Sequence, residues 1–199
     1  MPIDVIGLVL FAGAMIGTPG PANMVVMASG ARFGFWRSLP FLGGVITGKQ
    51  FIIWPLGLGL LQVLEPGSPV FLALKWASVA YILWLAWKIA GTTITRANAG
   101  PNPPRFVEGL IVHPLNPKAW AMVIGALTNF TDPTAPALVV TALLALSFFL
   151  IQCVLQSIWT LLGAKIAGFV AGTAREIWLM RALAVLMVIS VLYVLIKGG

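Results

Sequence analysis

The chain has 199 residues, of which 60% are hydrophobic and 9% are charged, and its formal net charge is +7. Soluble domains are about 45–50% apolar and about 25% charged, so a soluble core cannot enclose this much apolar surface, and lipid is the expected solvent. The basic residues stand singly between apolar runs, which favours membrane topology over a nucleic-acid partner as their explanation. A single cysteine, Cys153, excludes an internal disulfide, and neither a metal site nor a cofactor is predicted.

The first apolar run, at about 4–27, is long enough to cross a bilayer, but its middle cannot form a regular helix. It contains the segment Gly-Thr-Pro-Gly-Pro-Ala-Asn at 17–23, in which Pro19 and Pro21 each remove a backbone donor and clash with the preceding turn. At membrane depth such a break is tolerated only where the freed backbone is buried in protein or lines a polar cavity. The start of the chain lacks the basic region of a signal peptide, so the first helix is expected to remain in the mature protein.

Five further helices and two polar loops are expected in this order: helices at about 38–64 and 70–90, a loop at 91–105, helices at about 106–130 and 135–162, a basic loop at 163–176, and a last helix at about 177–196. The second helix is expected to kink at Pro55, and the fourth contains another break, His-Pro-Leu-Asn-Pro-Lys at 113–118. In the fifth, Gln152, Gln156 and Thr160 recur every four residues and predict a polar stripe that faces other helices and not lipid.

The positive charges predict how these helices are oriented. The turns after the first, third and fifth helices hold most of the basic residues: Arg32, Arg37, Lys88, Arg96, Arg105, Lys165, Arg175 and Arg181. By the positive-inside rule these turns are cytoplasmic and both termini lie outside. The long loop after the third helix divides one transmembrane domain, 1–199, into halves of about 1–95 and 96–199 that enter the membrane in opposite directions. The predicted fold is an all-α integral membrane protein of six transmembrane helices, a 3+3 inverted repeat in which the first helix of each half is broken at a Pro/Gly motif.

The two breaks predict a binding site for an anion. An interrupted helix presents free amides and a partial positive charge at the start of its second segment, and such helix ends bind carboxylates. Thr18 and Asn23 can add hydroxyl and amide contacts. Lys49 and Lys118 lie about ten residues inside their helices, which at about 1.5 Å per residue is near the midplane, where ionisable groups are functional candidates. Without a carboxylate at that depth, the two lysines suggest a substrate carboxylate as their partner. The alternative is that each lysine donates hydrogen bonds to carbonyls freed at a helix break.

Three residues are candidates for proton coupling: Lys49, His113 and Lys118. His113 is the only histidine of the chain, and either a proton-carrying role or a purely structural hydrogen bond explains it. The complete predicted substrate-binding set is Thr18, Pro19, Gly20, Pro21, Asn23, Lys49, Asn116, Pro117 and Lys118.

Motifs along the whole chain point to one family. The first is Thr18-Pro19-Gly20-Pro21 with Asn23, and the second is the glycine pattern of Gly44, Gly48 and Gly57-Leu58. The third is the run from Leu74 to Leu83. The last two are Phe106-Val107-Glu108-Gly109-Leu110 and Asn116-Pro117-Lys118-Ala119. Together they resemble the LysE/RhtB-type amino-acid exporters of the LysE superfamily, and the ordered pair TPGP and NPKA is the most specific part. The resemblance implies a six-helix, inverted-repeat exporter in the bacterial cytoplasmic membrane. It further implies that the protein moves amino acids or related metabolites, is driven by proton exchange, and can form a homodimer.

Three positions depart from the family pattern. Ala22 separates TPGP from Asn23, Lys49 stands where many members have an acidic or neutral polar residue, and Leu-Thr-Asn-Phe at 127–130 replaces a common Pro-Gln-Phe. An added positive charge at the site disfavours substrates with cationic side chains, such as lysine or arginine. The expected substrate is therefore a small carboxylate-bearing metabolite, in the first place a neutral amino acid, with an acidic amino acid as another candidate.

Two other classes of protein are weighed against an exporter. A non-transporting membrane subunit or scaffold has little reason to keep two broken helices and two lysines near the midplane. An intramembrane enzyme needs a nucleophile or a metal, and the chain has no HExxH, no GxSxG and no paired carboxylates, although a serine acting with His113 stays open. The sequence favours a transporter over both.

Overall fold

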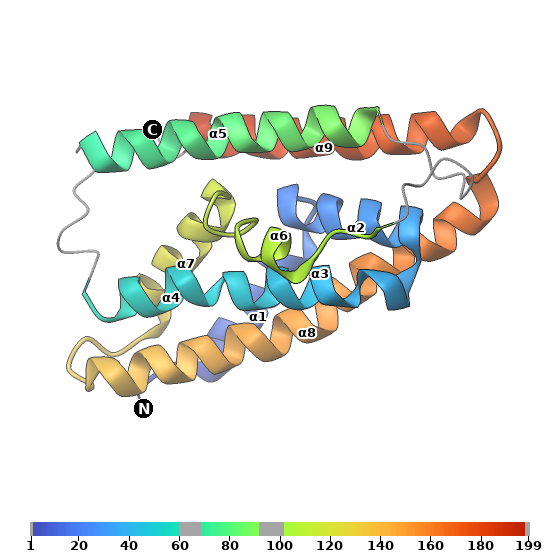
Figure 1. The fold of residues 1–199 in the computed structure, drawn as a ribbon. Helices are drawn as coiled ribbons and strands as arrows, with labels where there is room; N and C mark the ends of the chain where they lie inside the picture. Colours follow the sequence, from blue (N-terminus) through green and yellow to red (C-terminus); the bar gives the residue numbers. More distant parts are fainter. Residues whose placement is uncertain (1, 60–68, 92–101, 198–199) are drawn as a thin grey trace.

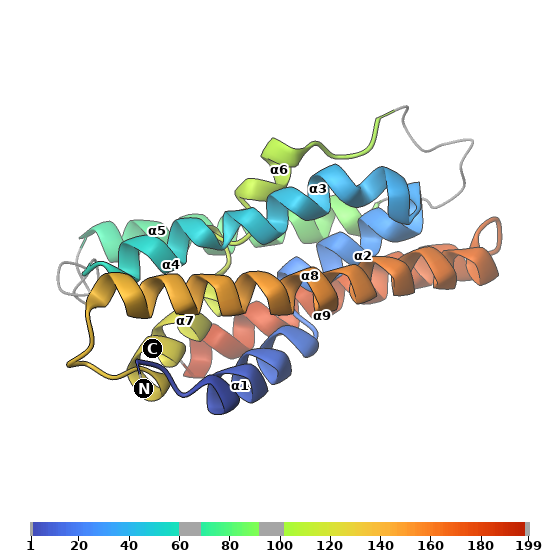
Figure 2. The same cartoon turned by 90° about the horizontal axis from the view of Figure 1, so that it is seen from below.

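The computed structural model describes residues 2–59, 69–91 and 102–197. Within these ranges the chain forms nine helices and no β-strand, which confirms the all-helical prediction for the described part. The helices are α1 (Val5–Gly17), α2 (Pro21–Phe33), α3 (Phe35–Gly48), α4 (Gln50–Gly57), α5 (Pro69–Ala90), α6 (Phe106–Leu110), α7 (Pro117–Phe130), α8 (Ala137–Val170) and α9 (Arg175–Lys197). The long helices run roughly along one axis and form an elongated bundle (Figures 1 and 2).

The first apolar run forms two helices, α1 and α2, which are bent by 56° relative to each other across residues 18–20. Pro21 is the first residue of α2, where its missing amide proton costs no helical hydrogen bond. α2 continues beyond the predicted end at 27 as far as Phe33. It stops at Gly34, whose φ of +80° is readily adopted only by a residue without a Cβ atom.

The second apolar run differs from the expectation of one helix with a kink at Pro55. The interruption lies at Lys49, between α3 and α4, and Pro55 is inside α4, close to its end at Gly57. Lys49 keeps helical angles (φ −66°, ψ −27°), and its carbonyl accepts hydrogen bonds from the amides of both Ile52 and Ile53. The break is therefore local, and the helical hydrogen-bond pattern resumes in α4 directly after Lys49. The predicted continuation from 60 to 64 lies outside the described residues.

The expected basic loop at 163–176 is wrong for most of its length, because α8 runs on to Val170 and α9 begins at Arg175. Gly163, the first residue of the expected loop, lies inside α8 and has a packing role. A Cβ atom at this position would lie 2.0 Å from the backbone oxygen of Met27, so the glycine serves the close approach of α8 to α2. The turn between α8 and α9 falls instead at Gly172, where φ is +76°.

α1 and α7 lie side by side and antiparallel. The amide of Asp4, which caps the start of α1, donates to the carbonyl of Phe130 at the end of α7, with the nitrogen 2.8 Å from the oxygen. The turn after α7 is closed by Thr134, whose amide and hydroxyl both donate to Asp132, and these bonds hold the pKa of that carboxyl below its usual range. The antiparallel pairing brings the end of α1, where the first break lies, next to the start of α7.

The chain between α6 and α7 is not helical at 111–116, so the second break begins two residues earlier than predicted, and Pro117 and Lys118 already belong to α7. Pro117 is the first residue of the new helix, and the side-chain oxygen of Asn116 accepts a hydrogen bond from the amide of Lys118. Both α2 and α7 therefore start with a proline at the position where this residue is best tolerated.

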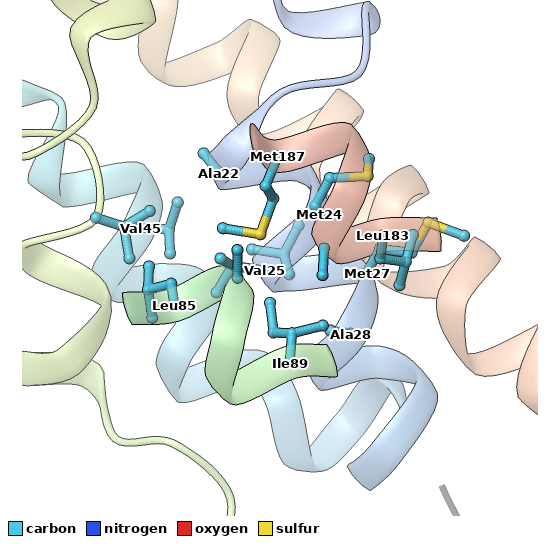
Figure 3. Packing of buried hydrophobic residues seen from close by; sticks show 14 of the residues in the cluster. Ala22, Met24, Val25, Met27, Ala28, Val45, Leu85, Ile89, Leu183 and Met187 are labelled. Atoms are coloured by element: carbon cyan, nitrogen blue, oxygen red, sulfur yellow. The ribbon is translucent and has the colours of Figure 1, made fainter. Parts of the chain in front are cut away.

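Two apolar clusters hold the bundle together. One joins α2, α3, α5 and α9, and Figure 3 shows Met24, Val25, Leu85, Leu183 and Met187 meeting there. The other joins α1, α4, α7 and α8. The three polar residues of α8 are buried: Gln152, Gln156 and Thr160 are at most 1% exposed.

Length and composition alone identify two described helices that can cross a membrane, at Ala137–Val170 and Arg175–Tyr193, or three spans if the bent pair α1 and α2 counts as one. Large apolar side chains on the outside of these helices are exposed, as expected of a lipid-facing surface: Ile6, Leu10, Leu138, Val154, Phe169, Val185 and Leu192 are examples. The ends of α2, α5 and α8 and the starts of α3 and α9 lie toward one end of the bundle (Figure 1). These segments carry most of the described basic residues, whereas Arg96 lies outside the described residues.

Candidate functional site

A cavity of about 20 Å³ lies where the two breaks meet, enclosed by the link between α1 and α2, the junction of α3 and α4, the link between α6 and α7, and α8. It is lined by Met15, Ile16, Gly20, Ala22, Asn23, Lys49, His113, Asn116, Lys118, Ala119, Met122 and Gln156. A water molecule needs about 10–15 Å³ measured in this way, so the cavity holds little more than one water. We call it the inner cavity. It brings together five residues of the predicted substrate-binding set and also His113 and Gln156.

Asn23 uses its side-chain amide within the fold. Its Nδ2 donates to the backbone oxygen of Ile16 over 2.6 Å and to that of Thr18 over 2.8 Å. These oxygens belong to the last turn of α1 and its cap, which have no helical donors because the helix ends there. Asn23 therefore holds the first break in shape, and its amide nitrogen is not directed at a ligand as the sequence suggested.

Replacing Asn23 by alanine is expected to lower the free energy of unfolding by about 2 kcal/mol, because the buried carbonyl of Ile16 loses its donor, at about 1–3 kcal/mol for an unpaired group, while the carbonyl of Thr18 keeps only Lys118. Denaturant titration in detergent micelles measures the change. Asn129→Ala serves as the control, since the Asn129 amide donates to Gly125 at an exposed position. Equal stabilities of the two variants would contradict this role for Asn23.

Lys118 reaches from the start of α7 to the first break. Its Nζ lies 2.9 Å from the hydroxyl of Thr18, 3.2 Å from the backbone oxygen of Thr18 and 3.3 Å from that of Pro19. This is the arrangement given above as the alternative to carboxylate binding, in which the lysine bonds to carbonyls freed at a helix break. The side chain is only partly buried and also lines the inner cavity, so its charge faces the cavity while it clamps the two breaks together.

Lys49 has a different environment. The residue is completely buried, and its Nζ lies 3.4 Å from the sulfur of Met122 and 4.9 Å from the centre of the Phe148 ring. A thioether and an aromatic face are weak partners for an ammonium group. No carboxylate of the described residues pairs with Lys49 or Lys118. The inner cavity thus has two basic side chains and no acidic one.

Other polar atoms at the cavity are also without partners among the described residues. Both ring nitrogens of His113 and the side-chain oxygen of Gln156 are buried and make no hydrogen bond. Gln152, one turn earlier on α8, donates to the carbonyl of Ile46 but leaves its own oxygen without a donor. Buried polar groups are normally satisfied, so these atoms mark a place suited to a polar ligand or to water.

The starts of α2 and α7 add partial positive charge at the same place. Gly20 and Asn116, which precede the two helices, and Ala22 and Ala119 inside their first turns all line the inner cavity. First-turn amides of a helix have no carbonyl partner in the helix, and together with the dipole they favour anions. The site is therefore electropositive from two lysines and two helix ends.

The structure places every residue of the predicted set at or beside this site. Thr18 and Pro19 contact Lys118, Pro21 and Pro117 begin the two helices, and the remaining residues line the inner cavity. Sequence reasoning missed Met122 and Phe148, the neighbours of Lys49. Met122 follows Lys118 by one helical turn, a spacing that could have indicated a shared face, whereas no sequence signal links Phe148 to Lys49. The described residues contain no group of three or more histidine, cysteine, aspartate or glutamate side chains that could hold a metal ion.

Comparison with known families agrees with this geometry. A sequence model of the family described as LysE type translocator matches residues 13–198. The chain belongs to this family. The match confirms the resemblance drawn from the TPGP and NPKA motifs.

Among curated relatives, the Cysteine/O-acetylserine efflux proteins of Salmonella choleraesuis and Salmonella typhimurium are each 35% identical to the chain over 124 residues. The protein of the same description from Escherichia coli O157:H7 is 33% identical over 124 residues. These alignments cover 61% of this chain and 62% of each relative, which is less than two thirds of the relatives' length. No solved structure matches the chain.

Proposed function

We propose that the protein is a secondary-active exporter of a small carboxylate-bearing metabolite, in the first place a neutral amino acid, which it moves across the cytoplasmic membrane in exchange for protons. The observation that carries the proposal is the inner cavity, where two lysines and two helix starts meet without an acidic residue. If the transported substrate is itself the anion, its carboxylate supplies the negative charge that the cavity lacks.

The substrate carboxylate is proposed to bind between Lys49 and the starts of α2 and α7. Lys49 is the strongest attractor, because it is fully buried and its present neighbours are the weak partners Met122 and Phe148. Lys118 has better partners in Thr18 and Pro19, which the carboxylate would have to replace. Since the cavity holds little more than one water, substrate binding requires the two breaks to move apart.

The amino group of the substrate is proposed to meet neutral acceptors. The oxygen of Gln156 and a ring nitrogen of His113 are buried without hydrogen bonds and line the same cavity. An acidic counterpart is lacking, so an additional positive side chain on the substrate would meet Lys49 and Lys118 unopposed. Both compounds in the name of the relatives, cysteine and O-acetylserine, are neutral amino acids, which supports this substrate class.

Proton exchange is proposed to use Lys49, His113 and Lys118. All three line the inner cavity and sit where a carboxylate arrives and leaves. Exchange requires that the substrate and the proton occupy the inner cavity in turn. A ring nitrogen of His113 can accept a hydrogen bond from the substrate amino group only while it is neutral, so a proton that binds there displaces the amino group. Lys49 and Lys118 hold the carboxylate beside His113, so that the loss of either contact releases the substrate.

The membrane arrangement proposed for the protein is six spans in two inverted halves. α1 with α2 begins the first half and α6 with α7 begins the second, and in each pair the later helix starts with a proline at the inner cavity. Counting α3 with α4 as one span, and adding α5, α8 and α9, gives six. The end of the bundle that gathers the basic residues would face the cytoplasm, with α1 beginning and α9 ending outside.

Efflux from proteoliposomes tests the function. Vesicles loaded with O-acetyl-L-serine, L-cysteine, L-lysine or L-arginine are diluted into a more acidic buffer, so that inward proton flow drives export. We expect neutral amino acids to leave at least about ten times faster than the cationic ones, a discrimination of about 1.4 kcal/mol. Protein-free vesicles and a protonophore are the controls. A preference for lysine or arginine would overturn the substrate assignment, and no export of any amino acid would favour the scaffold alternative.

A further inference from the structure

A second and larger cavity, of about 280 Å³, lies between α2, α3, α5, α6 and α9. We call it the outer cavity. Its walls are largely apolar, with Val25 and Ala28 of α2 facing Leu85 and Ile89 of α5 (Figure 3), and with Met180 of α9 beside them. Its volume lies just below the about 300 Å³ at which small-molecule sites in proteins start, so only a compact metabolite would fit.

Arg32, on the last turn of α2, lines the polar side of the outer cavity, together with Ser29, Tyr81 and Lys88. The guanidinium of Arg32 lies 5.1 Å from the centre of the Phe33 ring, and its Nε is buried without a hydrogen-bond partner among the described residues. Glu108 also lines the outer cavity, but its carboxylate lies 3.6 Å from the Nε of Arg105. Guanidinium groups are well suited to bind carboxylates through two parallel hydrogen bonds.

The outer and inner cavities share two walls. α2 lines the inner cavity with Ala22 and Asn23 and the outer one with Val25, Ala28 and Arg32. In the chain between α6 and α7, Val112 lines the outer cavity and the next residue, His113, lines the inner one. From Asn23 to Arg32 the distance along the helix is about 14 Å at about 1.5 Å per residue. The outer cavity lies toward the end of the bundle that carries the basic residues.

We propose that the outer cavity is a loading site, where a carboxylate-bearing substrate binds through Arg32 before it passes between α2 and the α6–α7 link to the inner cavity. The proposal rests on the proposed function, in which this end of the bundle faces the cytoplasm. The apolar walls accept the side chain of an uncharged amino acid, and the guanidinium holds its carboxylate. Attraction by a cation at the entrance also raises the rate at which an anionic group is captured.

Arg32→Gln is expected to raise the internal O-acetyl-L-serine concentration for half-maximal efflux about tenfold, with the maximal rate changed by less than about twofold. The loading site affects how tightly the substrate is first bound, whereas Lys49 and the starts of α2 and α7 affect how fast the bound substrate is moved. Arg175→Gln is the matched control, because it removes the same charge from an exposed position at the same end of the bundle. Equal half-saturation in the two variants and the wild type overturns the proposal. An effect of Arg32→Gln confined to vesicles with anionic phosphatidylglycerol, and not seen in phosphatidylcholine, would assign the cavity to a lipid headgroup and also overturn it.

Thiol labelling tests binding without transport. In a Cys153→Ser background, Ala28→Cys places one thiol in the wall of the outer cavity, and Ile111→Cys offers a more exposed alternative if the first variant does not fold. O-acetyl-L-serine is expected to slow labelling severalfold, ethanolamine, which lacks the carboxylate, is expected not to, and Arg32→Gln is expected to abolish the protection. Efflux without protection overturns the loading site and leaves the proposed function standing. Protection without efflux of any amino acid overturns the proposed function and leaves a carboxylate-binding cavity.

Discussion

Lys118→Ala is expected to reduce amino-acid efflux to the level of protein-free vesicles while the protein still inserts into the membrane. The substitution removes a positive charge from the inner cavity and three contacts that join α7 to the first break. The backbone oxygens of Thr18 and Pro19 lose a charged donor, and hydrogen bonds of this kind contribute about 1.5–3 kcal/mol. Both effects act on the place where the substrate carboxylate is proposed to bind.

Efflux and stability must be measured together. A Lys118 that only joins α7 to the first break and a Lys118 that binds substrate predict different combinations of efflux and stability. Thr18→Val removes the shortest of the three contacts and keeps the lysine charge. If Lys118 binds substrate, Thr18→Val loses some stability and retains most of its efflux, whereas Lys118→Ala loses all efflux. Lys165→Ala, at an exposed position of α8, is the control for the loss of a lysine. Normal efflux by Lys118→Ala would leave Lys118 with the structural role alone.

The composition of the inner cavity could be predicted because the signals for it are local. A proline pair or an Asn-Pro-Lys motif within an apolar run marks a break wherever the chain folds, and a lysine at membrane depth marks a polar interior. Local signals of this kind are therefore enough to single out Asn23, Lys49, His113, Asn116 and Lys118. Their meeting in one cavity follows from the antiparallel packing of α1 and α7, which the inverted-repeat hypothesis anticipates.

The partners of these residues could not be predicted, because they depend on packing. Lys118 turned out to bond to the first break, and Asn23 to the end of α1, whereas Lys49 packs on Met122 and Phe148. Glycine was the most misleading residue. The same residue type ends a helix at Gly34, with φ of +80°, and lies within a continuous helix at Gly163. Only the approach of a neighbouring backbone distinguishes the two cases.

That close approach leads to the largest effect expected on folding. Gly30→Ala and Gly163→Ala are each expected to lower the free energy of unfolding by about 3 kcal/mol or more, the upper range for an overpacked core. A Cβ atom at Gly30 would lie 2.0 Å from the backbone oxygen of Thr160, and one at Gly163 would lie 2.0 Å from that of Met27. Backbone atoms cannot rotate away as a side chain can, so α2 and α8 must separate. Thermal unfolding and gel filtration in detergent measure the loss.

The control and the double variant make this prediction specific. Gly168→Ala lies on α8 as well, but a Cβ atom there meets no atom within 4 Å, so alanine is expected to be neutral or to stabilise the helix by about 0.5–1 kcal/mol. In the double variant one separation of α2 from α8 accommodates both methyl groups, so the combined cost should be less than the sum of the two. Strict additivity would mean that the two glycines act at independent contacts. The same separation would move Asn23 on α2 away from Gln156 on α8, and both residues line the inner cavity. Variant protein that still folds is therefore expected to have reduced efflux.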